Sequence, residues 1–251
     1  MMNQNPGLRD FFASGFYEEY WPEADDPGSV KAHAAQVLSL LNASQGHILD
    51  WRGGHGRYAI WFARAGLQVT LLDFMREYLD AAKSLFDEAA LPVRLIEVDS
   101  RNTPRDIEAD FAVCLNSSVG FMSEDEEVKA FASLNAALRP GARLLLDCMN
   151  LFSLMKPIAG CAIENRGDDG CIRRSEGRFD FETNVWHKTF ELVKPDGTSV
   201  RREFNQTIYT PQQLVSLLRH AGFTTERVLG DFDGSPISFD SRKIVMIVRK
   251  E

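Results

Sequence analysis

Short apolar runs alternate with segments of helical periodicity along most of the chain. In the helical segments the apolar residues recur every three or four positions, whereas the runs between them are short and continuous. From residue 47 to residue 149 the predicted order is strand 47–51, helix 56–65, strand 68–73, helix 75–89, strand 93–98, strand 110–116, helix 124–139 and strand 142–149. Strands that alternate with helices in this way predict a parallel sheet.

The pattern changes after about residue 160. Glycine-rich loop signals come first, and then residues 178–193 and 198–209 alternate as two strands around the hairpin turn Pro195-Asp-Gly197. Thr210 and Gln213 form a capping box that predicts the start of a last helix. Residues 223–231 and 243–249 are predicted to form an antiparallel hairpin at the edge of the main sheet.

The N-terminal segment 8–24 is rich in aromatic residues and predicts one or two short helices. Its aromatic side chains are Phe11, Phe12, Phe16, Tyr17, Tyr20 and Trp21. Two roles stay open for this segment. It packs as a cap on the sheet edge, or it closes over a ligand with Tyr17, Tyr20 or Trp21 facing the pocket.

The most informative stretch is the turn between the first strand and the first helix of the predicted sheet. Asp50 ends the strand, and the glycines Gly53, Gly54 and Gly56 follow at once. Such a turn lets a nucleotide-like ligand approach the backbone, because a side chain there would block it. The second strand ends in Asp73, about 20 residues on, where folds of this kind place a carboxylate that holds ribose hydroxyls.

Composition narrows the classes of partner. The chain has 251 residues and a formal net charge of −8, which disfavours a broad nucleic-acid interface because that needs a basic face. No apolar run approaches the length of a membrane span, and the N-terminus shows no secretory signal. We therefore expect a cytoplasmic protein, monomeric or homodimeric, with no nucleic-acid partner, no membrane association and no metal site.

Several motifs together resemble those of the class I S-adenosylmethionine (SAM) methyltransferases. The segment Asp50-Trp51-Arg52-Gly53-Gly54-His55-Gly56 resembles motif I of that family, although Arg52 stands where the family has a small residue. Five further matches follow in the family's order. They are Asp73, Val98-Asp99-Ser100, the strand Asp110–Asn116, Leu138-Arg-Pro-Gly141 and the segment Tyr209–Phe223. Gly230–Gly234 resembles a loop of many bacterial members, and the similarity covers roughly residues 30–250.

The resemblance implies a Rossmann-like α/β fold, with a seven-stranded, mostly parallel sheet, flanking helices and a small antiparallel β insertion. It implies three segments: residues 1–150 as helical cap and SAM-binding core, 151–209 as an insertion that covers the substrate side, and 210–251 as the last helix and two core strands. The cofactor would be SAM, and the acceptor a small molecule methylated by in-line transfer. The implied cofactor-binding residues are Asp50, Arg52, Gly53, Gly54, Gly56, Asp73, Phe74, Asp99, Ser100 and Asn116.

Each of these residues has an implied role. Asp50 organises the glycine loop and the ammonium of the methionine moiety, and Asp73 binds the ribose hydroxyls. Asp99 accepts the adenine amino group with Ser100 nearby, and Asn116 holds the methionine end. For Arg52 three interpretations stay open: it points to solvent, it pairs with the SAM carboxylate, or it obstructs the pocket.

The catalytic candidates are His187, Tyr17 and Tyr20. A neutral imidazole near pH 7 suits a base for a protonated acceptor. Three alternative functions also stay open. The first is a dinucleotide-dependent dehydrogenase, since Gly54-x-Gly56-x-x-Ala59 fits the dinucleotide-binding fingerprint weakly. The second is an enzyme that cyclises or cleaves the aminobutyrate arm of SAM, and the third is a catalytically degenerate SAM-binding protein.

Overall fold

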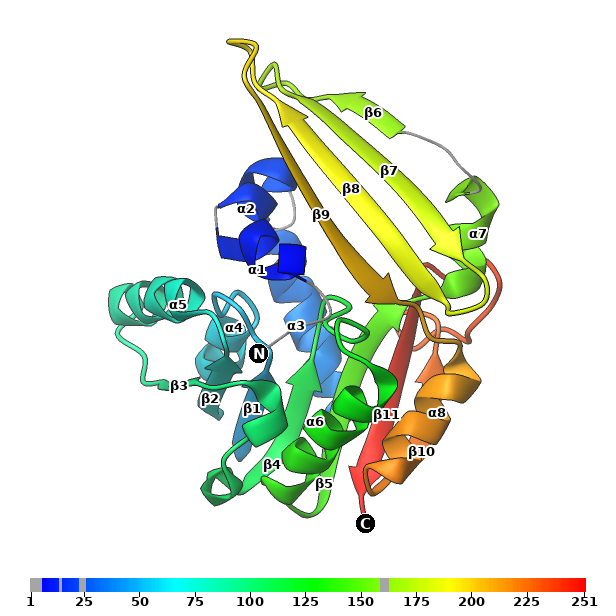
Figure 1. The fold of residues 1–251 in the computed structure, drawn as a ribbon. Coiled ribbons are helices and arrows are strands. Elements are labelled where there is room, and N and C mark those ends of the chain that lie inside the picture. The colour runs from blue at the N-terminus through cyan, green and yellow to red at the C-terminus, as the bar shows by residue number, and fades with distance from the viewer. Residues whose placement is uncertain (1–5, 14, 23–25, 159–162) are drawn as a thin grey trace.

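The computed structural model describes residues 6–13, 15–22, 26–158 and 163–251. Its larger sheet has the strand order β10-β11-β5-β4-β1-β2-β3 (Figure 1). The strands are β1 (His47–Trp51), β2 (Gln68–Asp73), β3 (Arg94–Glu97), β4 (Ala109–Cys114), β5 (Leu138–Met149), β10 (Phe223–Leu229) and β11 (Lys243–Lys250). Strands β1 to β5 run parallel, and β11 is antiparallel to both β5 and β10. The predicted seven-stranded, mostly parallel sheet is confirmed.

Helices cover both faces of this sheet. One face carries α6 (Glu124–Ala136) and α8 (Pro211–His220), and the other carries α3 (Pro27–Leu41), α4 (Ala59–Arg64) and α5 (Arg76–Glu88). Because successive strand residues point to opposite faces, Ile48 packs in one core layer and Leu49 in the other. All five residues of β1 are buried, as expected of the central strand of a doubly covered sheet.

The insertion contains more strands than the sequence predicts. It is a separate antiparallel sheet of β6 (Ile163–Arg166), β7 (Ile172–Asp180), β8 (Val185–Val193) and β9 (Ser199–Thr207), in that order. The single strand predicted for residues 178–193 is wrong, since the chain turns at residues 181–184 between β7 and β8. The Asp180 carboxylate accepts the backbone N–H groups of Glu182 and Thr183, and Asn184 has a φ of 57°, so polar turn chemistry breaks the strand. A helix, α7 (Leu151–Ile158), precedes this sheet.

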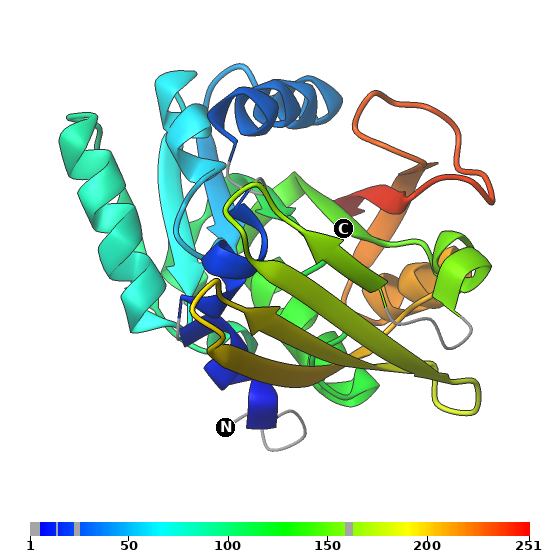
Figure 2. The same ribbon diagram turned by 90° about the horizontal axis from the view of Figure 1, so that it is seen from above.

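Two N-terminal helices, α1 (Pro6–Ala13) and α2 (Phe16–Tyr20), lie beside the second sheet in both views (Figures 1 and 2). Their buried aromatic side chains join those of β8 and β9 in one apolar cluster: Leu8, Phe11, Phe16, Tyr20, Phe190, Leu192 and Phe204. The contact is very close at Gly7, where a Cβ atom would lie 2.0 Å from the carbonyl oxygen of Glu203. Glycine therefore lets α1 pack directly on the backbone of β9.

Candidate functional site

The loop that joins β1 to α4 is shaped by glycine and by two carboxylates. Gly54 and Gly56 have positive φ values of 58° and 79°. A Cβ atom on Gly53 would lie 2.6 Å from the carboxyl carbon of Asp50, so only glycine leaves room for that side chain. Asp73 accepts the N–H of Gly54 at 3.0 Å, and this bond ties the loop to the end of β2. Asp73 thus holds the loop predicted from the sequence, and the Asp50 side chain packs against it at Gly53.

A cavity opens above this loop, at the carboxyl ends of the first four strands. It has about 1030 Å³ of empty space, including its open mouth. One wall comes from the strand ends and includes Asp50, Arg52, Gly53, Gly54, Asp73, Phe74, Ser100 and Asn116. The opposite wall comes from α1, α2 and the segment after β4, with Leu8, Phe12, Tyr17, Phe121 and Met122. A ligand here would lie between the parallel sheet and the aromatic N-terminal helices.

Asp50 is the most unusual group on the cavity wall. Its side chain is 2% exposed, and its Oδ2 atom has no hydrogen-bond partner within the part of the chain that the structure describes. Burial raises the pKa of Asp50 to about 7, and the nearby charge of Asp73 adds to the increase. A cationic ligand group beside this carboxylate would lower its pKa again and would give the Oδ2 atom a partner.

Asp73 is also buried, but its oxygens are occupied differently. One oxygen accepts the N–H of Gly54 and the other accepts the N–H of Met75 at 2.9 Å. Burial raises the pKa of Asp73, while these two bonds counteract the increase. Each carboxylate oxygen has a second lone pair. Asp73 can therefore hold the loop and still accept hydrogen bonds from a ligand.

Asn116 begins the segment 116–122, which we call the β4 loop. Asn116 has a φ of 61°, and its N–H donates to the buried Asp147 carboxylate at 2.7 Å. Burial raises the pKa of Asp147. This bond fixes the start of the β4 loop. Asn116 therefore lies on the cavity wall, as the sequence predicts.

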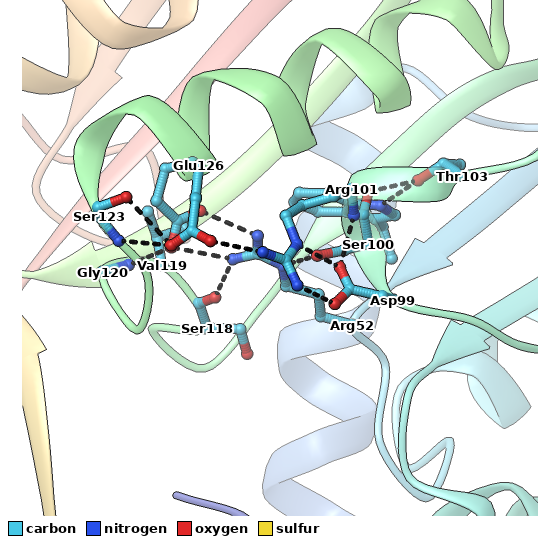
Figure 3. Close-up of polar contacts among 12 residues, drawn as sticks. Arg52, Asp99, Ser100, Arg101, Thr103, Ser118, Val119, Gly120, Ser123 and Glu126 are labelled. Atoms are coloured by element: carbon cyan, nitrogen blue, oxygen red, sulfur yellow. Dashed lines mark hydrogen bonds and ion pairs between the residues drawn. The ribbon is translucent and has the colours of Figure 1, made fainter. Parts of the chain in front are cut away.

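Arg52 neither points to solvent nor stands free in the cavity. Its guanidinium donates to the Ser118 carbonyl at 2.6 Å, to the Ser100 hydroxyl at 3.1 Å and to the Glu127 carboxylate at 2.9 Å (Figure 3). The group also stacks over the Trp51 ring at 4.2 Å from its centroid. The interpretation of Arg52 as a solvent-facing residue is therefore wrong.

Two predicted cofactor-binding residues are not among the cavity-lining residues: Gly56, which faces Leu71 and Ala82 in the core, and Asp99. Both oxygens of Asp99 accept from the guanidinium of Arg101, which also pairs with Glu126 (Figure 3). This bond network holds the pKa of Asp99 below its usual range. The neighbouring Val98 and Ser100 line the cavity instead.

Of the three catalytic candidates, only Tyr17 lines the cavity. Tyr20 is buried in the apolar cluster between α2 and the second sheet. His187 lies on β8, where its Nδ1 atom is 2.8 Å from the Asn205 Oδ1 atom. No described residue of β6 to β9 is among the cavity-lining residues, so the second sheet supports the helices that cover the cavity and does not itself reach it.

Sequence reasoning missed several lining residues. Arg57 directly follows the last glycine of the loop, and its Nη2 atom donates to the Tyr17 hydroxyl at 3.2 Å. Tyr78 of α5 and the pair Phe121 and Met122 also line the cavity. The position of Arg57 next to Gly56 was a usable signal, whereas the others depend on how distant helices and loops meet.

A seven-stranded sheet of this order, with a glycine loop after its first strand and an acid after its second, has the class I methyltransferase fold. Residues 48–141 match the family model described as a methyltransferase domain. The resemblance to the methyltransferases inferred from the sequence is therefore confirmed over this segment.

Two relatives and one solved structure extend this result. YqeM of Bacillus subtilis (strain 168), assigned to the methyltransferases, is 24% identical over 212 residues, which are 82% of this chain and 85% of YqeM. The S-adenosyl-L-methionine-dependent Diels-Alderase iliD of Neonectria sp. (strain DH2) is 27% identical over 139 residues, 55% of this chain and 53% of iliD. The crystal structure of a SAM-dependent methyltransferase from Clostridium acetobutylicum superimposes with a TM-score of 0.80 at 16% identity, covering 94% of this chain and 97% of that one.

Two further features bear on the kind of site. Every helix within the described residues is too short or too polar to cross a membrane. The described part of the chain also brings together no group of three or more His, Cys, Asp or Glu side chains that could hold a metal ion.

Proposed function

We propose that this chain is a SAM-dependent methyltransferase that acts on a small-molecule acceptor. The observation that carries the proposal is the buried, unpartnered oxygen of Asp50 beside a glycine loop that Asp73 holds in place. An ammonium group would satisfy that oxygen, and vicinal hydroxyls would suit the free lone pairs of Asp73. SAM carries both groups, and the residues present fit it.

Most of the other predicted residues fit the same ligand. Gly53 and Gly54 line the cavity and leave the backbone open to close approach, and Phe74 provides an apolar surface beside the ribose-binding acid. Gly56 instead shapes the turn, with a φ of 79°. Ser100 and Asn116 lie on the same wall. We retain residues 1–150 and 210–251 as cap and core. Residues 151–209 were expected to cover the substrate side, but no described residue of β6 to β9 lines the cavity, so we propose that this insertion supports the covering helices α1 and α2.

Bound SAM would supply an electrophilic methyl group for in-line displacement. The chain's own residues would then need to orient the acceptor and exclude water. Tyr17 is the proposed catalytic residue, because it lines the cavity and its hydroxyl is held by Arg57. The wall formed by Leu8, Phe12, Phe121 and Met122 favours an apolar or aromatic acceptor of small size.

A second candidate is a SAM-binding enzyme that does not transfer the methyl group. One observation favours it: the similarity to iliD, whose name describes a SAM-dependent Diels-Alderase. The two candidates share the cofactor site and differ in the fate of SAM. S-adenosylhomocysteine would indicate methyl transfer, methylthioadenosine would indicate loss of the aminobutyrate arm, and unconsumed SAM during turnover would indicate a cofactor role.

Calorimetric titration with SAM tests the site. Replacing Asp73 by Ala removes a charged acceptor worth about 1.5–3 kcal/mol, so affinity should fall roughly ten- to a hundredfold. Asp80→Ala is the matched control, because Asp80 is an exposed acid on α5 outside the cavity. Equal affinity of Asp73→Ala and wild type would reject the ribose assignment. Incubation with SAM and a metabolite extract, followed by mass spectrometry of the nucleoside products, then separates the two candidate functions.

A further inference from the structure

The β4 loop, residues 116–122, connects the proposed cofactor site to the acceptor wall. Asn116 and Ser118 line the cavity near the strand ends, and Phe121 and Met122 line it on the side of α1 and α2. Any shift of this loop would therefore move both sides of the cavity at once. What holds its backbone in place then matters for how donor and acceptor meet.

One buried ion pair joins the β4 loop to the loop after β1. Glu127 is fully buried in the first turn of α6, and one of its oxygens accepts the N–H of Gly120 at 2.8 Å. The other oxygen accepts from the Arg52 Nη2 atom at 2.9 Å. A single carboxylate thus ties the backbone of the β4 loop to a residue that directly precedes the glycine turn.

Arg52 makes a second, direct tie to the same loop. Its Nη1 atom donates to the Ser118 carbonyl at 2.6 Å and faces the Glu127 carboxylate at 3.4 Å, while Nε donates to Ser100 at 3.1 Å. These contacts and the Nη2 bond use four of the five guanidinium N–H groups. A guanidinium engaged in this way is poorly placed to make a bidentate contact with a ligand carboxylate.

The backbone of Arg52 is adapted to this arrangement. Its φ is 62°, a left-handed conformation that costs free energy in a residue other than glycine. The cost is offset by the buried pair and by the stacking of the guanidinium over Trp51. A small residue at this position, as in the motif that the sequence resembles, could make none of these contacts.

We propose that Arg52 is a positioning residue, which through Glu127 and Ser118 holds the β4 loop in register with the glycine loop, and that it is not a ligand of the SAM carboxylate. The proposal rests on the proposed function for the identity of the cofactor. It replaces the two remaining interpretations of Arg52, as a carboxylate ligand or as an obstruction, by a role in the geometry of the cavity.

The test compares Arg52→Met, Glu127→Met and the double variant. Because Glu127 does not line the cavity, it can influence SAM only through the two groups that it holds, Gly120 of the β4 loop and Arg52. We expect each single variant to weaken SAM binding by a similar factor, roughly three- to thirtyfold, and the double variant to bind no worse than the weaker single variant. Hydrogen exchange of the Gly120 amide in the ligand-free protein should be faster in all three variants. Glu127→Met and the double variant remove the acceptor of this amide, whereas Arg52→Met leaves the acceptor but no longer holds it in place.

Arg143 and Glu226 supply the control, since this partly exposed pair joins β5 to β10 and lies outside the cavity. Arg143→Met and Glu226→Met should leave SAM affinity and the exchange of Gly120 unchanged. If a single variant does not fold because it leaves a buried charge unpaired, the double variant provides the test, because it replaces the pair by two apolar side chains.

Three results would overturn the proposal. A ligand role predicts that Arg52→Met weakens SAM binding much more than Glu127→Met does, and an obstructing role predicts tighter binding in Arg52→Met. Unchanged exchange of Gly120 in folded Arg52→Met, which keeps the Glu127 acceptor, would show that the pair does not hold the loop. If wild type does not bind SAM, the proposed function fails, and the exchange measurement still decides the role of the pair.

Discussion

Lys188 offers a test of the second sheet that does not depend on any ligand. This residue of β8 is 7% exposed, and its ammonium donates to the Gln206 Oε1 atom at 2.8 Å beside the Trp186 ring. Burial lowers the pKa of Lys188 from 10.5 to about 7. The native protein therefore binds this proton less tightly than the unfolded chain does.

The magnitude follows from the pKa difference. One pKa unit corresponds to about 1.4 kcal/mol, so a fall from 10.5 to about 7 corresponds to about 5 kcal/mol. Between pH 7 and pH 10.5 the unfolded chain holds more protons at this site, and the free energy of unfolding rises with pH. At pH 6 the burial of Lys188 lowers the free energy of unfolding by nearly this full amount, whereas at pH 9 it lowers it by about 2 kcal/mol.

Replacing Lys188 by Met removes the titrating group and keeps the length of the side chain. The variant also leaves Gln206 Oε1 without its donor, but that loss is the same at both pH values. We therefore expect the difference in free energy of unfolding, variant minus wild type, to be larger at pH 6 than at pH 9 by roughly 2–3 kcal/mol. Urea denaturation with linear extrapolation measures both values.

The control is Lys83→Met, an exposed lysine of α5 paired with Asp87. Its effect on the free energy of unfolding should change by less than about 0.5 kcal/mol between the two pH values. A Lys188→Met effect that is equal at pH 6 and pH 9 would show that the lysine keeps an ordinary pKa and that β8 does not bury it as described.

Two further predictions concern the packing of α1 on the second sheet. Gly7→Ala should lower the free energy of unfolding by about 1–3 kcal/mol, because the new methyl group meets the Glu203 carbonyl oxygen. Urea denaturation measures this change, with Gly28→Ala as the control because a Cβ atom has room there. Equal stability of the two variants would contradict the close approach at Gly7. Phe11→Ala should lower the same free energy by about 3–5 kcal/mol, since its buried ring stacks edge-on against Phe204 at 4.7 Å. A change below 1 kcal/mol in calorimetric unfolding would contradict a fully packed cluster.

The parallel core could be predicted from the sequence because its signals are local. The strands β1 and β2 are short, almost fully buried runs of mainly apolar residues, and each has an acid at or next to its carboxyl end. The predicted strand 47–51 and strand 68–73 coincide with β1 and β2. The glycines of the loop were equally readable, since positive φ values and close backbone contacts leave few other choices.

The second sheet was harder to predict because its strands carry a weaker signal. Residues of β7 alternate between partly buried and exposed positions, and none is fully buried. Without a buried face, the strand lacks the apolar alternation on which the prediction depends. The turn at residues 181–184 did carry a signal in Asp180 and Asn184, which was outweighed by the apolar residues on either side.

The site shows the same division between local and distant contacts. Asp50 and Asp73 were predictable because strand ends meet at one edge of a parallel sheet. The partner of Arg52 is Glu127, 75 positions along the chain, and nothing in the local sequence indicates that pairing. Asp99 shows the converse case, because its neighbour Arg101 engages both carboxylate oxygens and turns an expected ligand into a structural contact.

The β4 loop also explains how a sheet that does not line the cavity can influence it. Gln206 of β9 donates its amide to the carbonyls of Ser117 and Val119, and the Thr207 N–H donates to the Gly120 carbonyl at 2.7 Å. The core holds the same loop from the opposite side through Arg52 and Glu127. The β4 loop therefore contacts both the core and the second sheet. Through this loop the second sheet can fix the distance between the cofactor wall of the cavity and the aromatic wall of α1 and α2. Sequence changes in β8 and β9 would then alter acceptor geometry while leaving the glycine loop and its acids in place.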